Sequence, residues 1–262
     1  MSIINVNNLC FYRKHKNIFN NISLNIEKEK ITAIMGPSGC GKTTLLKLIC
    51  RQIKQDTGTI TINGKNTSLL KTKELYNMRK DIGVLFQSGT LFTDLNVYEN
   101  VAFPIREHTN LSEELIKYLV LMKLQSVGLR WTINLMPSEL SIGMAKRVAL
   151  ARTIALDPSI IMYDEPFSGQ DPISMGILLK LIKLLNKSLK ITTVIVSHDV
   201  FETMNIADYV YIINNCKIVA QGHPKIITNI NDKFIKEFIN NDINYKYHLQ
   251  YNKKQYEHDL FN

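Results

Sequence analysis

The stretch GPSGCGKT, residues 36–43, places glycines, a lysine and a threonine at the spacing GxxxxGK[ST]. It stands between an apolar strand-like run that ends at Met35 and a helix-like run, KTTLLKLICRQI. Glycines let backbone N–H groups turn inward, and a helix N-terminus adds positive charge, so this context favours phosphate binding over a chance glycine-rich turn. The predicted phosphate-binding residues are Gly36, Pro37, Ser38, Gly39, Cys40, Gly41, Lys42, Thr43 and Thr44.

Two carboxylates follow a second apolar run, in the sequence IIMYDEP. Asp164 ends a predicted strand, where a carboxylate beside the phosphate loop can hold Mg²⁺ directly or through water. Glu165 comes next and is suited to polarise an attacking water as general base. A pair of acids that merely starts a loop is the alternative. The phosphate loop alone does not separate a kinase, a GTPase and a motor ATPase, and this second pattern narrows that choice.

Three further polar residues and one short motif could join such a site. Gln87 ends GVLFQ, His198 ends TTVIVSH, and Asp171 lies in SGQD, six residues past Glu165. Each alone is compatible with an ordinary loop amide, a capped strand end or a loop acid. The motif LSIGM, residues 140–144, opens an apolar and basic run typical of an amphipathic helix. It also has the composition of half a phosphate-binding site.

Taken in order, the phosphate loop, Gln87, LSIGM, MYDEP, SGQD and VSHD resemble the motifs of the ATP-binding-cassette (ABC) nucleotide-binding domain, over about residues 3–232. The resemblance implies a homodimer that binds ATP and Mg²⁺ between the phosphate loop of one copy and LSIGM of the other. ATP would close this dimer and hydrolysis would open it. The implied catalytic residues are Lys42, Gln87, Glu165 and His198, and the implied metal ligands are Thr43, Gln87 and Asp164.

The same resemblance assigns the remaining contacts. Lys42 would reach the β- and γ-phosphates, and His198 the γ-phosphate. Gln87 would also couple the site to a membrane partner. The second copy would contribute Ser141 and Gly143 to the γ-phosphate, and Asp171 would bridge the two copies. An aromatic side chain stacks on adenine in this family, and Tyr12 and Phe11 are the rival candidates for it, with Tyr12 preferred.

Two features of these motifs invite separate expectations. Ile142 stands where the family usually has glycine, and we expect a working but slower site if the side chain points away from phosphate. Cys40 lies among backbone donors at a helix N-terminus, which tends to lower the pKa of a thiol. We therefore expect alkylation of Cys40 to block ATP binding.

The chain also resembles a narrower group, the ATPase subunits of the Mla phospholipid transport system, which maintains outer-membrane lipid asymmetry in Gram-negative bacteria. The resemblance rests on residues 84–109, on MPSELSIGM and on DEPFSGQDPISMG, and it extends to a tyrosine-containing tail that ends in YEHDLFN. It implies an inner-membrane permease, a periplasmic lipid-binding subunit and a small STAS-domain protein as partners. It also implies a peripheral location on the cytoplasmic face of the inner membrane.

Strand and helix patterns must position these residues, and they alternate along the chain. The predicted fold class is α/β, of the P-loop NTPase type: a mainly parallel sheet, with an antiparallel β subdomain and an inserted helical subdomain. We expect one nucleotide-binding domain over residues 1–241. Its core would comprise residues 1–92 and 157–241, and the helical subdomain about residues 93–156. The resemblance to the Mla ATPase subunits implies that residues 242–262 form a tail that contacts the neighbouring subunit.

Composition sets limits on the alternatives. The chain has 262 residues, a formal charge of +9 and four cysteines without a CxxC pair, which suits a reducing compartment. We expect neither a signal peptide nor a membrane span. A soluble ABC ATPase acting on DNA or ribosomes fits the charge, but Gln87 and Ser141 are only 54 positions apart, too close for a long coiled-coil arm. We therefore expect no nucleic-acid partner. A transporter of another substrate stays open, whereas a small-molecule kinase would have no use for LSIGM.

Overall fold

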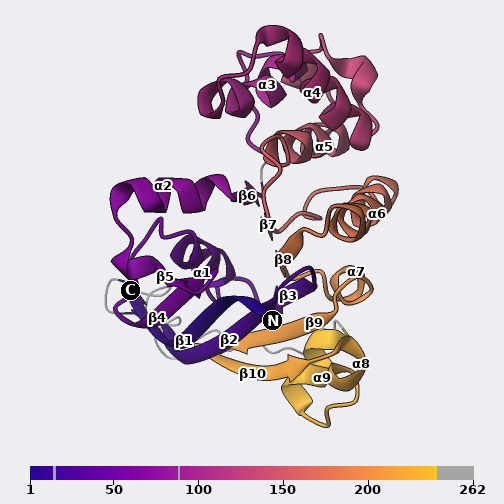
Figure 1. The fold of residues 1–262 in the computed structure, drawn as a ribbon. Coiled ribbons are helices and arrows are strands. Elements are labelled where there is room, and N and C mark those ends of the chain that lie inside the picture. The colour runs from indigo at the N-terminus through magenta and orange to yellow at the C-terminus, as the bar shows by residue number, and fades with distance from the viewer. Residues whose placement is uncertain (14–15, 88, 241–262) are drawn as a thin grey trace, which may run out of the picture.

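A six-stranded sheet forms the centre of the computed structural model, which describes residues 1–13, 16–87 and 89–240 (Figure 1). Its strand order is β10-β9-β3-β8-β7-β6, and all neighbours are parallel except β9 and β10. Inner strands such as β7 are buried on both faces, which explains their continuous apolar sequence. The strands are β3 (Ile31–Met35), β6 (Ile82–Leu85), β7 (Ile160–Asp164), β8 (Thr192–Ser197), β9 (Tyr209–Asn214) and β10 (Lys217–Gly222).

A second, antiparallel sheet packs beside the first, in the order β2-β1-β4-β5. Its strands are β1 (Ser2–Arg13), β2 (Lys16–Glu27), β4 (Thr57–Ile62) and β5 (Lys65–Asn66). The turn between β4 and β5 has positive φ at both Asn63 and Gly64, the conformation that Asn-Gly pairs favour in tight hairpins. Helix α1 (Lys42–Ile49) shares one apolar core with both sheets, through residues such as Leu45 and Leu48.

Helices cover the central sheet on two sides. Because successive strand residues point to opposite faces, Met162 of β7 packs with the core around α1, while Ile161 and Tyr163 pack with α6 (Pro172–Leu189) and α5 (Ile142–Thr153). Helices α3 (Val97–His108), α4 (Glu113–Ser126) and α5 form a group beyond the β6 edge of the sheet (Figure 1). Ser112 caps α4 by accepting a hydrogen bond from the backbone of Leu115.

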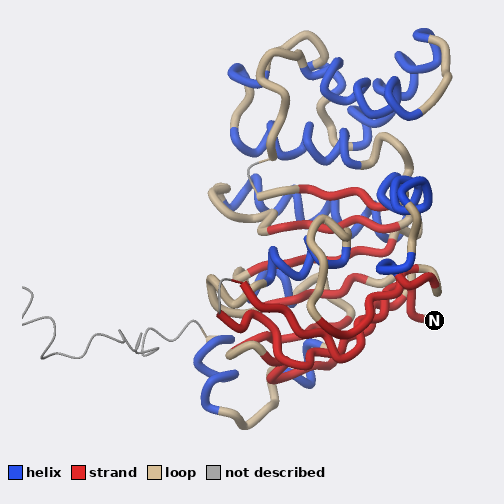
Figure 2. Tube along the Cα trace, turned by 90° about the vertical axis from the view of Figure 1, so that its left-hand side faces the viewer, coloured by secondary structure: helices blue, strands red, loops and turns tan. Residues whose placement is uncertain are grey.

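Shorter elements complete the described chain (Figure 2). Helices α7 (Val200–Met204), α8 (Pro224–Ile227) and α9 (Lys233–Ile239) enclose a small third core against β3, β9 and β10. Helix α2 (Thr72–Lys80) has no fully buried residue and is mostly polar, and it was not among the predicted helices. The short 3-10 segments are Thr67–Leu69, Arg130–Thr132 and Pro137–Glu139.

The predicted fold class is confirmed by this arrangement, which combines a mainly parallel sheet, an antiparallel β unit and a helical region. In the part of the chain that the structure describes, no helix has both the length and the apolar character needed to cross a bilayer. The predicted tail contact at residues 242–262 lies outside the described residues.

Candidate functional site

Three parallel strands bring the predicted chemistry together at one edge of the sheet. Met35 of β3 is aligned with Ser197 of β8, and Asp164 of β7 is aligned with the neighbouring Val196. The loops that follow β3, β7 and β8 therefore leave the sheet at the same level. This carboxyl edge is where open α/β sheets bind ligands.

The phosphate loop wraps around the ammonium group of Lys42. Its Nζ donates hydrogen bonds to the carbonyl oxygens of Gly36 at 2.8 Å and Pro37 at 3.2 Å, and it lies 3.3 Å from Glu165 Oε1. The Lys42 side chain is 5% exposed, so these oxygen partners replace water around a buried charge. Phosphate oxygens can replace these carbonyl and carboxylate oxygens as partners of the Lys42 ammonium group.

Two glycines of the loop are required by close approaches of other strands. A Cβ on Gly36 would lie 2.3 Å from the carbonyl oxygen of Ile213, and one on Gly41 would lie 2.7 Å from Ile18 Cγ2. Both contacts are shorter than side chains tolerate, and both φ angles are positive, at 154° and 103°. The loop therefore has backbone groups where other residues would have side chains, which is the property a phosphate cradle needs.

Thr43 and Asp164 meet at the start of α1. The Thr43 hydroxyl donates to Asp164 Oδ1 at 2.8 Å, and Asp164 as a residue is 5% exposed. Burial raises the pKa of Asp164, and the hydrogen bond from Thr43 partly opposes that effect. A hydroxyl and a carboxylate are ligands of the kind that Mg²⁺ prefers, so this pair fits the predicted metal.

Glu165 lies between Lys42 and His198. Its Oε2 accepts hydrogen bonds from the His198 ring Nδ1 at 2.7 Å and from the His198 backbone N–H at 3.2 Å. Asp199 is close as well, 3.9 Å from the other ring nitrogen of His198. Asp199 directly follows His198 in the motif VSHD but was not among the predicted site residues. This arrangement holds a buried carboxylate in one orientation beside the phosphate loop.

Ser141, Gly143 and Asp171 form a separate group. Ser141 caps α5 by accepting a hydrogen bond from the backbone of Met144 at 3.2 Å. Asp171 caps α6 through backbone N–H groups of Ile173 and Ser174, and hydrogen bonds from Ser174 lower the pKa of Asp171. Among the described residues, no hydrogen bond or ion pair joins this group to Lys42 or Glu165.

Among the described residues, neither Gln87 nor Tyr12 forms a hydrogen bond with the ionisable groups of the site. The side-chain hydrogen bond found for Gln87 runs from Nε2 to Ser168 Oγ at 3.4 Å, and does not involve Thr43 or Asp164. Tyr12 is 51% exposed, whereas its rival Phe11 packs against the core that includes α1. The structure therefore leaves Tyr12 as the accessible aromatic.

The prediction that the pKa of the Cys40 thiol is lowered is wrong. Burial raises the pKa of its thiol, and this effect outweighs the lowering by Lys42 and by backbone N–H groups. The prediction rested on the helix N-terminus, which lowers the pKa, and left out the burial of the sulfur atom, which raises it. A thiol with a raised pKa reacts slowly with alkylating agents at neutral pH, while the block of ATP binding by a fully alkylated Cys40 stays a prediction.

Two polar residues that the sequence did not reveal hold the loop after β6. Asn100 is fully buried; its amide donates to the carbonyls of Phe92 and Leu95 and accepts from the Phe92 N–H. Arg152 of α5 donates to the carbonyl of Thr90 at 2.7 Å and to Asn100 Oδ1 at 3.4 Å. An asparagine inside a helical pattern gives no signal of this role.

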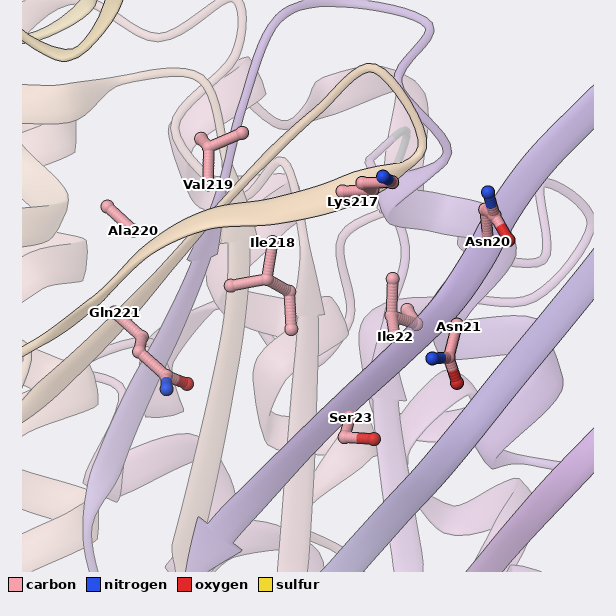
Figure 3. A pocket seen from close by; sticks show the side chains of 9 residues that line it. All are labelled: Asn20, Asn21, Ile22, Ser23, Lys217, Ile218, Val219, Ala220 and Gln221. Carbon is pink, nitrogen blue, oxygen red and sulfur yellow. The ribbon is translucent and has the colours of Figure 1, made fainter. Parts of the chain in front are cut away.

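An open hollow of about 750 Å³ lies away from these residues, between β2 and β10 (Figure 3). The two strands are edges of different sheets that touch where the N–H of Asn20 donates to the carbonyl of Cys216. They diverge beyond that point, with Ser23 on one side and Gln221 on the other. None of the residues that line the hollow belongs to the predicted site.

Known proteins share both the sequence and the fold. The family described as ABC transporter matches residues 19–168. The chain is 52% identical to the "Intermembrane phospholipid transport system ATP-binding protein MlaF" of Haemophilus influenzae, over 99% of this chain and 98% of that protein. The structure of cbiO1 from Clostridium perfringens, part of the ABC transporter complex cbiONQ, matches with a TM-score of 0.81 at 27% identity, covering 99% of this chain and 98% of that one. The cassette MJ0796, solved as a dimer in a post-hydrolysis state bound to ADP and Pi, matches with a TM-score of 0.77 at 29% identity, covering 84% and 98%.

Proposed function

Because this chain belongs to the ABC transporter family and is an ABC transporter ATPase, we propose that it is the ATP-hydrolysing subunit of a system that moves phospholipids between the inner and outer membranes. The resemblance stated from its motifs is confirmed. The observation that carries the proposal is the match to the MlaF protein of H. influenzae, which extends over nearly the whole of both chains. The clustering of Lys42, Thr43, Asp164, Glu165 and His198 supports the ATPase chemistry.

The phosphate loop is assigned to ATP and to its product ADP. Lys42 exchanges the carbonyl oxygens of Gly36 and Pro37 for phosphate oxygens, while the backbone N–H groups of residues 38–44 surround the phosphates. Thr43, Asp164 and Gln87 would hold Mg²⁺ together with phosphate oxygens and water. When bound, the ion neutralises negative charge on the transferred phosphoryl group.

Glu165 is assigned as the general base. Its carboxylate accepts a proton from the attacking water, and the hydrogen bonds from His198 keep it pointed toward the phosphate loop. His198 is about half exposed, so its ring can also contact a phosphate oxygen. Lys42 balances the negative charge of Glu165 when no phosphate is bound.

A second copy of the chain completes the site. Ser141 and Gly143 lie at the start of α5, apart from Lys42, and would contact ATP held by the partner copy, with Asp171 between the two. ABC cassettes dimerise and work with permease subunits. For this chain we assign an inner-membrane permease, a periplasmic lipid-binding subunit and a STAS-domain protein as partners. The chain would then act at the cytoplasmic face of the inner membrane.

Residues 1–241 form one nucleotide-binding domain in this proposal. Its helical subdomain spans about residues 93–156 and includes α3, α4 and α5. This subdomain carries Ser141 and Gly143, whereas the core carries Lys42 and Glu165. The division therefore places the two half-sites on different lobes of the same chain.

Affinity purification of the tagged full-length chain from solubilised native membranes tests this function. Mass spectrometry is expected to recover a permease, a periplasmic lipid-binding subunit and enriched glycerophospholipid. A Lys42→Ala chain serves as the control, because it should keep its partners while losing ATP hydrolysis. Recovery of another permease without enriched lipid would reject the phospholipid assignment and leave the ATPase chemistry standing.

A further inference from the structure

Helix α5 reaches the loop that follows Glu165 through one buried lysine. Lys146 lies one turn beyond Gly143 and is 5% exposed. Its Nζ donates to the carbonyl oxygen of Pro166 at 2.8 Å and also to that of Ser168. Pro166 directly follows Glu165 in the chain. The ammonium group is therefore hydrogen-bonded to the backbone next to the proposed general base.

A lysine is a costly residue at this position. Burial lowers the pKa of Lys146, and Asp199 offsets this only in part. A methionine would fill similar space without desolvating a charge, so packing does not account for the ammonium group. What lysine adds is a set of donors aimed at two carbonyl oxygens.

The loop needs such a restraint because of its backbone conformation. Glu165 has a φ of 48°, in the left-handed region that is unfavourable for a residue with a side chain. On the side toward β8, the Glu165 N–H donates to the carbonyl of Val196 at 2.8 Å. On the other side, the Pro166 carbonyl accepts from Lys146 and from the amide of Gln170 at 2.8 Å.

Lys146 also lies where the loops after β6 and β7 meet. Ser168, whose carbonyl it holds, accepts a hydrogen bond from Gln87 through its hydroxyl. Gly89 lies beside the lysine, since a Cβ added there would be in ordinary van der Waals contact with Lys146 Cγ, at 3.7 Å. The lysine is thus packed between the segment that carries Gln87 and the segment that carries Glu165.

We propose that Lys146 is a positioning residue for ATP hydrolysis, which holds the Glu165 carboxylate in line by gripping the following peptide from α5. The inference rests on the proposed function, because Ser141 and Gly143 at the start of the same helix are assigned to the nucleotide of a second copy. One rigid helix then contacts the nucleotide in one site and fixes the general base of the other. Lys146 acts through Glu165 and touches no reacting atom.

The test compares Lys146→Met and Lys146→Arg with the wild type, using the full-length chain, steady-state ATP hydrolysis and direct ATP binding. Lys146→Met is expected to lower kcat at least about tenfold and to change the KM for ATP less than about threefold. Lys146→Arg keeps a charged donor and is expected to remain within about threefold of the wild-type kcat. Such a split between kcat and KM indicates a displaced base with an intact nucleotide site.

Lys123→Met is the matched control. Lys123 is a largely buried lysine of α4 that pairs with Asp157, outside the site. Its loss removes the same charge in the same way and is expected to leave kcat and KM within about twofold. Thermal unfolding of every variant shows whether each one is folded at the assay temperature.

A double variant decides whether Lys146 works through Glu165. In a Glu165→Gln background, adding Lys146→Met is expected to lower the residual rate by less than about twofold. A Lys146→Met chain with wild-type kcat would overturn the proposal. So would a full additional tenfold loss in the double variant, or a matching fall in kcat and ATP affinity. A wild-type chain that fails to hydrolyse ATP would instead reject the proposed function, before any variant is compared.

Discussion

Glu165 combines three constraints on one side chain: a left-handed backbone, an ion pair with Lys42 and two hydrogen bonds from His198. Each constraint restricts where the carboxylate can point. A general base must be held within hydrogen-bonding reach of the water it deprotonates, so these restraints serve the chemistry at the cost of local backbone strain.

Glu165→Gln is expected to bind ATP and to lose about 10²- to 10⁴-fold in hydrolysis rate, because an amide cannot accept the proton. With ATP bound and not consumed, the variant should accumulate as a dimer. Size-exclusion chromatography with ATP and Mg²⁺, beside a phosphate-release assay, measures both properties. Turnover close to that of the wild type would reject the general-base role.

Ile142→Gly is expected to raise ATPase activity no more than several-fold. Ile142 is 65% exposed as the first residue of α5, so within its own chain the side chain blocks nothing. Glycine there costs helix stability of at most about 1 kcal/mol. Steady-state ATPase rates of the two proteins give the comparison. An increase of about a thousandfold, or about 4 kcal/mol, would mean that isoleucine almost inactivates the natural site.

At the scale of elements, α5 and α6 are joined where their N-termini meet. A Cβ on Gly143 would lie 2.5 Å from Ser174 Oγ and 2.8 Å from Ser174 Cβ. Glycine at this position of LSIGM is therefore required by helix packing as well as by any phosphate contact. The start of α5 and the start of α6, with Asp171 as its cap, are expected to move together.

Gly143→Ala is expected to lower the free energy of unfolding by about 1–3 kcal/mol, because it overpacks this contact. Adding Ser174→Gly removes both crowded atoms and should recover much of the loss. Gly176→Ala is the control: its added methyl meets nothing within 4 Å, and it should stabilise α6 by about 0.5–1 kcal/mol. Urea unfolding curves measure all three. Equal stability of Gly143→Ala and wild type would contradict the contact.

Local patterns in the sequence could predict most elements, because strands such as β7 and the loop at residues 36–43 carry their signals within a few residues. They could also predict that the ends of β3, β7 and β8 share one edge. The grip of Lys146 on Pro166 and the packing of Gly143 on Ser174 could not be predicted, since each depends on how two distant elements meet. The Cys40 prediction failed for the same reason: burial is a property of the folded chain.

At the scale of the whole molecule, the predicted site residues divide into a P-loop group around Lys42 and a group around Ser141. If each site joins the P-loop group of one copy to the second group of the other, two different inactive chains can restore one another. In a dimer of one Lys42→Ala chain and one Ser141→Arg chain, one site combines both substituted groups and is inactive. The other site combines the two unchanged groups and is intact. The symmetry of a two-fold dimer requires this outcome.

An equal mixture of Lys42→Ala and Ser141→Arg chains, unfolded and refolded together, is expected to recover about a quarter of wild-type ATPase activity. Half of the dimers would be mixed, and each would hold one working site of two. Each variant refolded alone is the control and should stay inactive. No recovery on mixing, with mixed dimers demonstrated by two different affinity tags, would contradict a site shared between copies.

The order of strands also has a consequence for how the protein is made. Strand β3 pairs with β8 and β9, which the ribosome adds more than 150 residues later. At about 5–20 residues per second, β3 and the loop after it wait roughly ten to thirty seconds for those neighbours. During that time the newly made chain exposes the apolar strand ITAIM without a partner. Chaperones that bind short apolar segments can therefore act on this strand before the central sheet is complete.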